Sequence, residues 1–169
     1  MEFFFLLGFL AITLSIVFSS LFYGISPMPT NRKTQKKLVQ ILEKISPKKL
    51  VDLGSGWGSL CLEIAKKCPK TSVTGYEASF FPWLVSLLFR SESRRFFWKN
   101  FFKEPLEEYD VIVCYLYPGA MKKLRDKLEK ECKKDTVIVS NTFQIPGWTP
   151  SKIIPTHDFY GSFIYVYVR

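Results

Sequence analysis

The sequence is poor in residues that build metal sites and histidine-based catalytic centres. Its 169 residues include a single histidine, His157, which stands in a predicted turn between two short strands and is interpreted as a surface residue. Most of the four cysteines fall on ordinary apolar positions of predicted helices or strands, and their spacing is not that of metal ligands. The sequence therefore predicts no metal centre, and it predicts reduced thiols at Cys61, Cys68, Cys114 and Cys132.

Charge is missing from the start of the chain. No residue from Phe3 to Tyr23 is charged, and Phe, Leu, Ile and Val dominate this stretch. About twenty such residues are what a helix needs to cross the hydrocarbon core of a bilayer. A cleaved signal peptide would have a basic start and a shorter apolar core, whereas this chain begins Met1-Glu2. We expect residues 1–24 to form one retained transmembrane anchor, with cleavage near Ser19-Ser20 as the alternative.

Basic residues appear only after the apolar stretch. Four of them, Arg32, Lys33, Lys36 and Lys37, follow closely, and none precedes it. The positive-inside rule then predicts a single-pass membrane protein whose following domain faces the cytoplasm. The net charge of +9 suits an anionic membrane surface, an acidic partner or nucleic acid. No basic amphipathic transit peptide precedes the anchor.

A glycine-rich stretch, residues 49–59, organises the rest of the chain. A short apolar run ends there, glycines follow at 54, 56 and 58, and helical periodicity begins after them. Such a strand, tight turn and helix form a loop for a nucleotide cofactor, because glycine lets the backbone approach a ligand closely. The dinucleotide fingerprint G-x-G-x-x-G is absent, since Ser59 stands where its third glycine would fall.

An acid, Asp52, stands two residues before the first glycine. The resulting D-x-G-x-G-x-G pattern resembles motif I of the class I S-adenosylmethionine-dependent methyltransferases. The resemblance implies S-adenosyl-L-methionine as cofactor. It also implies cofactor contacts from Asp52, Gly54, Ser55, Gly56 and Gly58.

Strand and helix patterns alternate through residues 49–169. This order predicts an α/β fold, a Rossmann-like class I methyltransferase sheet that is mostly parallel, with helices on both faces and an antiparallel C-terminal strand. Residues 25–48 form a linker and an amphipathic helix over 33–45 that Thr30 or Asn31 can cap. We predict strands at 49–53, 71–76, 96–98, 110–115 and 136–139, helices at 59–68, 80–91 and 120–132, and an antiparallel pair at 152–154 and 159–168.

Two polar residues follow predicted strands where a nucleoside would bind. Glu77 ends the second strand, and an ionised carboxylate there can accept hydrogen bonds from both hydroxyls of a ribose. Asn100 follows the third strand, where methyltransferases commonly place an acid or amide against the adenine amino group. Both are predicted to contact the cofactor.

The residues that contact the substrate are predicted to lie after the fourth strand and in the linker. Ligands of open α/β sheets bind outside the carboxyl ends of the strands, so Tyr115 and Tyr117 should face the reacting methyl group. Tyrosine rings there can attract a cationic nitrogen. Thr30 lies in the linker, near the expected mouth of the site. These three residues are our candidates for the catalytic channel.

Over most of its length the chain resembles the membrane-anchored lysine methyltransferases, the mitochondrial enzymes that modify the c-ring protein of ATP synthase and the adenine nucleotide translocase, with smaller prokaryotic relatives. The resemblance implies lysine N-methylation of a membrane-associated protein. The segments that carry it are Pro27-Met28-Pro29-Thr30 with Gln35, Val51 to Gly56, Gly75-Tyr76-Glu77, Pro82 to Val85, Met121 to Leu128, and Phe143 with Pro146 to Pro150.

The chain departs from that family at three places. Trp57-Gly58-Ser59 replaces Asp-Gly-Arg, Asn100 replaces an aspartate, and Thr142-Phe143-Gln144 replaces an Arg-Phe-Pro type motif. Several alternatives therefore stay open. The substrate could be a lipid or quinone-like small molecule, or RNA, although the Asn-Pro-Pro-Tyr type of base-flipping signature is absent after the fourth strand. The chain could also be a non-catalytic S-adenosylmethionine-binding membrane module.

Overall fold

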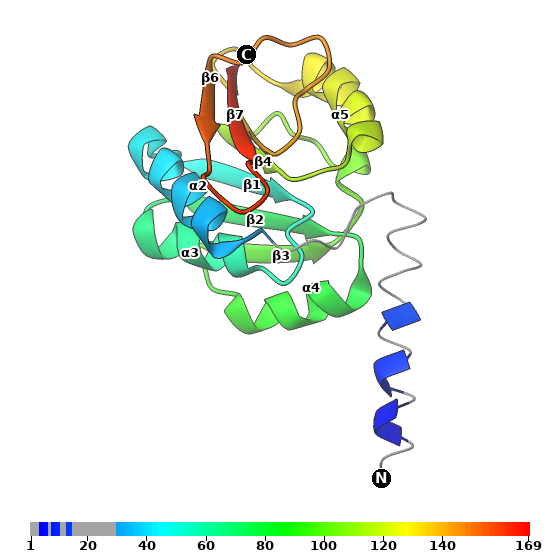
Figure 1. Ribbon diagram of the computed structural model, residues 1–169. Helices are drawn as coiled ribbons and strands as arrows, with labels where there is room; N and C mark the ends of the chain where they lie inside the picture. The colour runs from blue at the N-terminus through cyan, green and yellow to red at the C-terminus, as the bar shows by residue number, and fades with distance from the viewer. Residues whose placement is uncertain (1–3, 7, 11–12, 15–29) are drawn as a thin grey trace.

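A seven-stranded sheet with the order β3-β2-β1-β4-β5-β7-β6 forms the centre of the molecule (Figure 1). The structure is a computed structural model that describes residues 4–6, 8–10, 13–14 and 30–169. Strands β1 to β5 are parallel, whereas β7 is antiparallel to both β5 and β6. The strands are β1 Lys49–Leu53, β2 Ser72–Glu77, β3 Arg94–Trp98, β4 Val111–Cys114, β5 Val137–Asn141, β6 Lys152–Pro155 and β7 Phe163–Val168.

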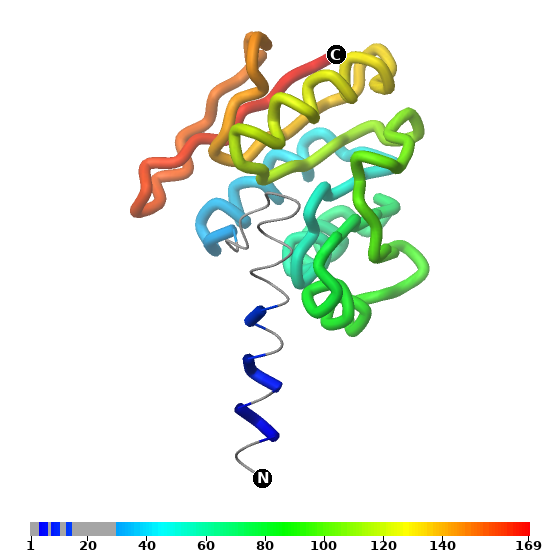
Figure 2. The backbone as a smooth tube through the Cα atoms, turned by 90° about the vertical axis from the view of Figure 1, so that its right-hand side faces the viewer, coloured from blue at the N-terminus to red at the C-terminus, as the bar shows by residue number. Residues whose placement is uncertain are grey.

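Helices cover both faces of this sheet, and Figure 2 shows α2 (blue) and α5 (yellow) on opposite sides of it. Alternating residues of β1 explain the two layers: Leu50 packs in the cluster that holds α2 and α3, whereas Val51 and Leu53 pack in the cluster that holds α5. The helices are α2 Arg32–Ile45, α3 Ser59–Lys67, α4 Phe80–Ser86 and α5 Pro118–Glu131, with short 3₁₀ turns at Leu87–Phe89 and Phe101–Lys103.

The predicted α/β fold class and the order of elements are confirmed within residues 30–169, and the bounds of several elements differ from those predicted. β3 begins two residues earlier than predicted. The helix that starts at Phe80 ends at Ser86 and continues as a 3₁₀ turn, after which the Arg94 side chain donates a hydrogen bond to the Phe89 carbonyl. The last strand begins at Phe163, because the Asp158 carboxylate accepts the backbone N–H groups of Tyr160 and Ser162 and makes residues 158–162 a turn.

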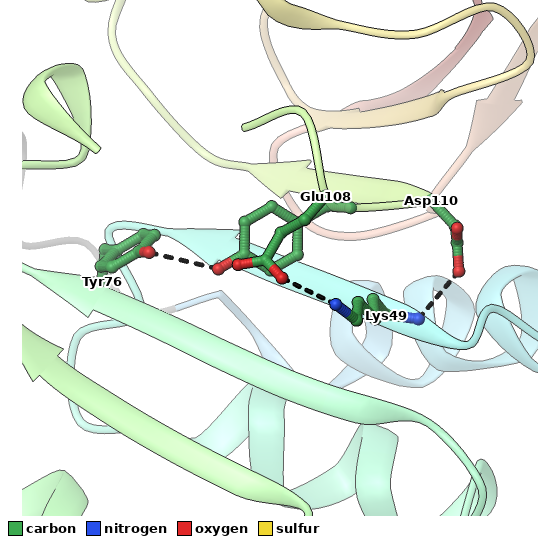
Figure 3. A network of polar contacts seen from close by, with 5 residues as sticks. Lys49, Tyr76, Glu108 and Asp110 are labelled. Carbon is green, nitrogen blue, oxygen red and sulfur yellow. Dashed lines mark hydrogen bonds and ion pairs between the residues drawn. The ribbon is translucent and has the colours of Figure 1, made fainter. Parts of the chain in front are cut away.

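Polar contacts hold β1 and β4 in register at the amino end of the sheet (Figure 3). The Lys49 ammonium group pairs with Glu108 at 2.7 Å, and the Lys49 backbone N–H donates to Asp110 at 2.8 Å. The hydroxyl groups of Tyr76 and Tyr109 lie 3.2 Å apart in the core. The contacts of Lys49 lie at the start of β1, whereas the glycine turn follows β1 at its other end.

The order in which the chain adds parallel strands reverses at β1, since β2 and β3 lie on one side of it and β4 and β5 on the other. Ligands of such sheets bind beyond the carboxyl ends of the strands at this switch point. The predicted anchor at residues 1–24 and the linker up to residue 29 lie largely outside the described residues. Within the described part of the chain, no helix is both long and apolar enough to cross a membrane.

Candidate cofactor site

The turn after β1 is built on glycines in the left-handed region. Gly54, Gly56 and Gly58 have φ values of 82°, 53° and 78°, which residues with a Cβ rarely adopt. The N–H groups of Gly54 and Ser55 both donate to the Tyr76 carbonyl at 2.9 Å. The turn is thereby fixed to the end of β2, next to Glu77.

The second and third glycines serve different purposes. A Cβ on Gly58 would lie 3.0 Å from the Phe96 ring and from Ser86, so Gly58 lets the start of α3 pack closely. A Cβ on Gly56 would meet no atom within 4 Å beyond the neighbouring residues. The open side of the turn is therefore at Gly56, where a ligand can approach the backbone.

Glu77 is held in place beside that open side. Its carboxylate accepts the Gly56 N–H at 2.8 Å on one oxygen and the Ser79 N–H at 2.7 Å on the other, and the residue is only 5% exposed. Each carboxylate oxygen can accept more than one hydrogen bond, so capacity remains for two hydroxyl groups. A nucleoside with a ribose diol fits this arrangement.

Ser55 lies underneath the turn. Its hydroxyl is buried, has no hydrogen-bond partner among the described residues, and lies where a Cβ on Gly75 would come within 2.7 Å of it. Gly75 in β2 is thus required to make room for Ser55. The predicted contact of Ser55 with the cofactor stays a prediction.

Asp52 faces α3 from β1. The buried Asp52 carboxyl accepts a long hydrogen bond from the Cys61 thiol, with 3.5 Å between sulfur and oxygen. Removal from water, reinforced by the nearby Glu77, raises the pKa of Asp52 to about 7, although the Cys61 hydrogen bond opposes the shift. Burial also raises the pKa of the Cys61 thiol. Direct contact of Asp52 with the cofactor stays a prediction.

Asn100 lies just beyond the end of β3. Its side-chain oxygen accepts the Phe102 N–H at 3.0 Å and caps the following 3₁₀ turn. This bond fixes the amide plane, and it leaves the amide NH₂ group and a second lone pair on the oxygen for other partners. Asn100 can therefore still contact an adenine ring as predicted.

The substrate candidates fall into two groups. Tyr115, directly after β4, stacks on Phe143 from the loop after β5, with ring centres 6.3 Å apart and planes at 22°. Tyr117 stands at the N-cap position of α5 without a capping bond from its side chain, and its ring occupies space that a Cβ on Gly119 would enter. Thr30 forms the second group and lies immediately before Asn31, which caps α2 and donates a hydrogen bond to Asp158 in the β6–β7 turn.

The comparison with protein families matches residues 52–152 to the ANTKMT methyltransferase domain. The chain belongs to this family. The predictions of a class I methyltransferase and of S-adenosylmethionine as its cofactor are thereby confirmed.

Three curated relatives of this chain are lysine methyltransferases according to their names. It is 29% identical over 135 residues to the Homo sapiens lysine N-methyltransferase named for the c-ring protein of ATP synthase, covering 75% of this chain and 56% of the relative. It is 28% identical over 137 residues to a protein-lysine N-methyltransferase of Saccharolobus islandicus, covering 78% and 84%. It is 34% identical over 115 residues to the adenine nucleotide translocase lysine N-methyltransferase of Mus musculus, covering 64% and 49%. The chain thus spans about half the length of the two mammalian relatives.

Solved structures agree on the fold. An RNA methyltransferase from Salinibacter ruber, in complex with S-adenosyl-L-homocysteine, superposes with a TM-score of 0.73 at 23% identity, covering 83% of this chain and 93% of that one. At that identity the likeness concerns the sheet and its helices.

Three contributors to the candidate site were not predicted as such. Ser79 supplies a backbone N–H to Glu77, Cys61 supplies the thiol beside Asp52, and Phe143 supplies the ring against Tyr115. Phe143 belongs to one of the segments that carried the family resemblance, and its aromatic character in a loop was a usable signal. The other two act through a backbone group and a buried thiol, which no sequence pattern distinguishes from ordinary packing.

Proposed function

We propose that this protein transfers methyl groups from S-adenosylmethionine to the side-chain amine of a lysine in a membrane-associated protein. The observation that carries the proposal is the Glu77 carboxylate, buried and held between the N–H groups of Gly56 and Ser79 beside the open glycine turn. The lysine as target is supported by the three curated relatives, each of which is named as a lysine methyltransferase.

The cofactor residues act by binding and orientation. Glu77 accepts the ribose hydroxyls, the backbone at Gly54 and Gly56 lies against the cofactor, and Asn100 contacts the adenine. The bound cofactor supplies a methyl group that its sulfonium already activates. What the protein must add is an aligned nucleophile, and alignment of this kind contributes several kcal/mol to rate enhancement.

The stacked rings of Tyr115 and Phe143 suit the arrival of a lysine. Aromatic faces attract the ammonium group, and the ring carbons also shield the amine from water. A lysine that is partly desolvated beside a cation has a lowered pKa, so its proton is lost more easily and the neutral amine can attack. Tyr117, which is half-exposed at the start of α5, forms the outer part of this channel.

The membrane location is proposed from the first part of the chain. The uncharged stretch from Phe3 to Tyr23 is long enough to cross a bilayer, and the basic residues from Arg32 to Lys37 favour the cytoplasmic side for the domain. A short linker keeps the site within a few nanometres of the lipid surface. A lysine close to the membrane surface is the target that this geometry can reach.

The test is to find where a labelled methyl group goes. Membranes and soluble extract from cells that lack the protein are incubated with the purified chain and methyl-labelled S-adenosylmethionine, then separated into protein, lipid and RNA. We expect label in a membrane protein, recovered as methyl-lysine after hydrolysis, and little label with Glu77→Gln. Label that appears in lipid or RNA would overturn the lysine assignment. Cofactor binding without label in any fraction would point to a non-catalytic module.

A further inference from the structure

The turn between β6 and β7 carries two of the most exposed aromatic side chains of the described domain. Phe159 is 98% exposed and Tyr160 is 73% exposed, and their rings contact each other edge to face at 5.7 Å. We call residues 157–162 the aromatic tip. In Figure 2 the hairpin that bears it (orange to red) projects away from the sheet. Rings this exposed have no role in the packing of the domain.

The aromatic tip is nevertheless a firmly built turn. The Asp158 carboxylate accepts the N–H groups of Tyr160 and Ser162, at 3.1 Å and 2.9 Å. The Ser162 carbonyl accepts both the N–H and the hydroxyl of Thr156. Hydrogen bonding lowers the pKa of Asp158 to about 2, with the Ser162 N–H as the largest cause and further bonds from the side chains of Ser162, Asn31 and Thr156. The carboxylate is therefore ionised and is used within the turn. The two rings are therefore presented on a preorganised support.

The tip is tied to the part of the chain that follows the apolar stretch. The Asn31 side chain donates to Asp158 at 2.8 Å, and the Thr34 hydroxyl donates to the same oxygen at 3.3 Å. The uncharged stretch ends at Tyr23, eight residues before Asn31. A fully extended chain of that length reaches at most about 30 Å, so the tip cannot be far from the end of the stretch.

The charges around the tip suit anionic lipid. Arg32, Lys33 and Lys36 are exposed on the first turns of α2, beside the contact with Asp158. Basic residues near a membrane are attracted to anionic headgroups, and aromatic rings favour the boundary between headgroups and acyl chains. A second exposed ring cluster, Phe80 with Trp98, is tied to the domain instead. Its ring centres lie 5.1 Å apart, and the Trp98 ring N–H donates to the Ala78 carbonyl.

We propose that the aromatic tip inserts Phe159 and Tyr160 into the headgroup region of an anionic bilayer, as a second membrane contact of the domain. This inference rests on the proposed membrane attachment through residues 3–23. Two contacts restrict rotation of the domain, whereas one linker leaves it free. The tip precedes Ile164, which pairs with Asn141 at the carboxyl end of β5, so insertion turns the carboxyl edge of the sheet, and with it the site, toward the lipid.

A fluorescent probe at the tip tests this contact in the full chain. Tyr160→Cys is labelled with an environment-sensitive dye and reconstituted into phosphatidylcholine vesicles with or without phosphatidylglycerol. Lys134→Cys is the matched control, because Lys134 is exposed and lies far from the tip. Its neighbour Asp135 donates its N–H to the Arg169 carbonyl, just after the end of β7 that lies opposite the tip. The unsubstituted chain, labelled in parallel, corrects for reaction of the native cysteines. Quenching by lipids with a nitroxide on the acyl chain reports insertion.

We expect blue-shifted emission and at least about twofold stronger quenching at position 160 than at position 134, larger with phosphatidylglycerol and reduced by Phe159→Ser. Equal quenching at both positions would overturn the proposal. An emission shift at position 160 that appears only when a membrane protein is added would indicate a protein partner instead. An emission shift in detergent that depends on protein concentration would indicate contact with a second copy. Either result would also overturn the proposal. Flotation of the same samples with the vesicles reports attachment separately, so failure of the anchor is distinguished from failure of the tip.

Discussion

At the scale of single residues, Gly56 offers the cleanest separation of binding from folding. Gly56→Ala should cost the fold only about 1–2 kcal/mol for the left-handed backbone, because its Cβ meets open space. The same Cβ enters the path of the cofactor, so the affinity for S-adenosylhomocysteine, measured by calorimetry, should fall at least about tenfold. Gly161→Ala is the control, since Gly161 has a similar φ of 61° and equally open surroundings. Unchanged affinity in Gly56→Ala would contradict the site.

Glu77 gives a second residue-scale prediction, on the charge of the site. Glu77→Gln keeps one acceptor oxygen, so only one of the Gly56 and Ser79 N–H groups stays bonded, and the ionised oxygens that a ribose diol needs are lost. Affinity for S-adenosylhomocysteine should therefore fall about 10- to 100-fold. The thermal unfolding temperature in the absence of ligand should fall by several degrees, because one of the two buried N–H groups loses its acceptor. Glu107→Gln, which removes an exposed carboxylate, should bind like the wild type. An equal effect of the two substitutions would contradict the assignment.

Asp52 should make the stability of the folded chain depend on pH. Its pKa is about 7 in the folded chain against an ordinary value of 3.8, so the unfolded chain releases this proton first as pH rises. Stability is therefore retained at low pH and lost between about pH 4 and 7, by roughly 2–3 kcal/mol between pH 5 and 8. Asp52→Asn should show a smaller loss over that range in denaturant unfolding. A variant that follows the wild type would show that Asp52 ionises normally.

At the scale of elements, one side chain at the start of α2 makes two stabilising hydrogen bonds. Asn31 accepts the Thr34 N–H as an N-cap and donates to Asp158 in the β6–β7 turn. Asn31→Ala removes both and should destabilise the chain by about 1–2 kcal/mol. Asn31→Ser keeps an oxygen for the cap and loses the donor to Asp158, so it should recover part of that loss in unfolding measurements. Equal stability of Ala and Ser variants would mean that the cap contributes nothing.

Elements with strong local signals were predictable, and contacts between distant elements were not. Helical spacing of Leu38, Val39 and Leu42 marked α2, and three alternating glycines marked the turn after β1. The bond between Asn31 and Asp158 joins residues 127 positions apart, and no local pattern encodes it. The ring-rich run from Phe159 was interpreted as strand because its residues favour strands, whereas one carboxylate bends its first residues into a turn. The roles of Tyr115, Tyr117 and Thr30 depend on a substrate and stay predictions.

At the scale of the whole molecule, the amino-terminal stretch and the basic start of α2 together predict an integral membrane protein. A chain held by a spanning helix should stay in the membrane pellet after alkaline carbonate extraction, whereas a chain held only by charge should be released. Leu10→Arg with Leu14→Arg adds two charges near the middle of the stretch, each costing about 2.5–3.5 kcal/mol at the centre of a bilayer. This double variant should be found mainly in the extracted fraction, and Leu10→Ile with Leu14→Ile should behave like the wild type. Release of the wild-type chain by carbonate would refute the anchor, yet it would leave the family and the cofactor site untouched, because those rest on residues 52–152 and on the geometry around Glu77.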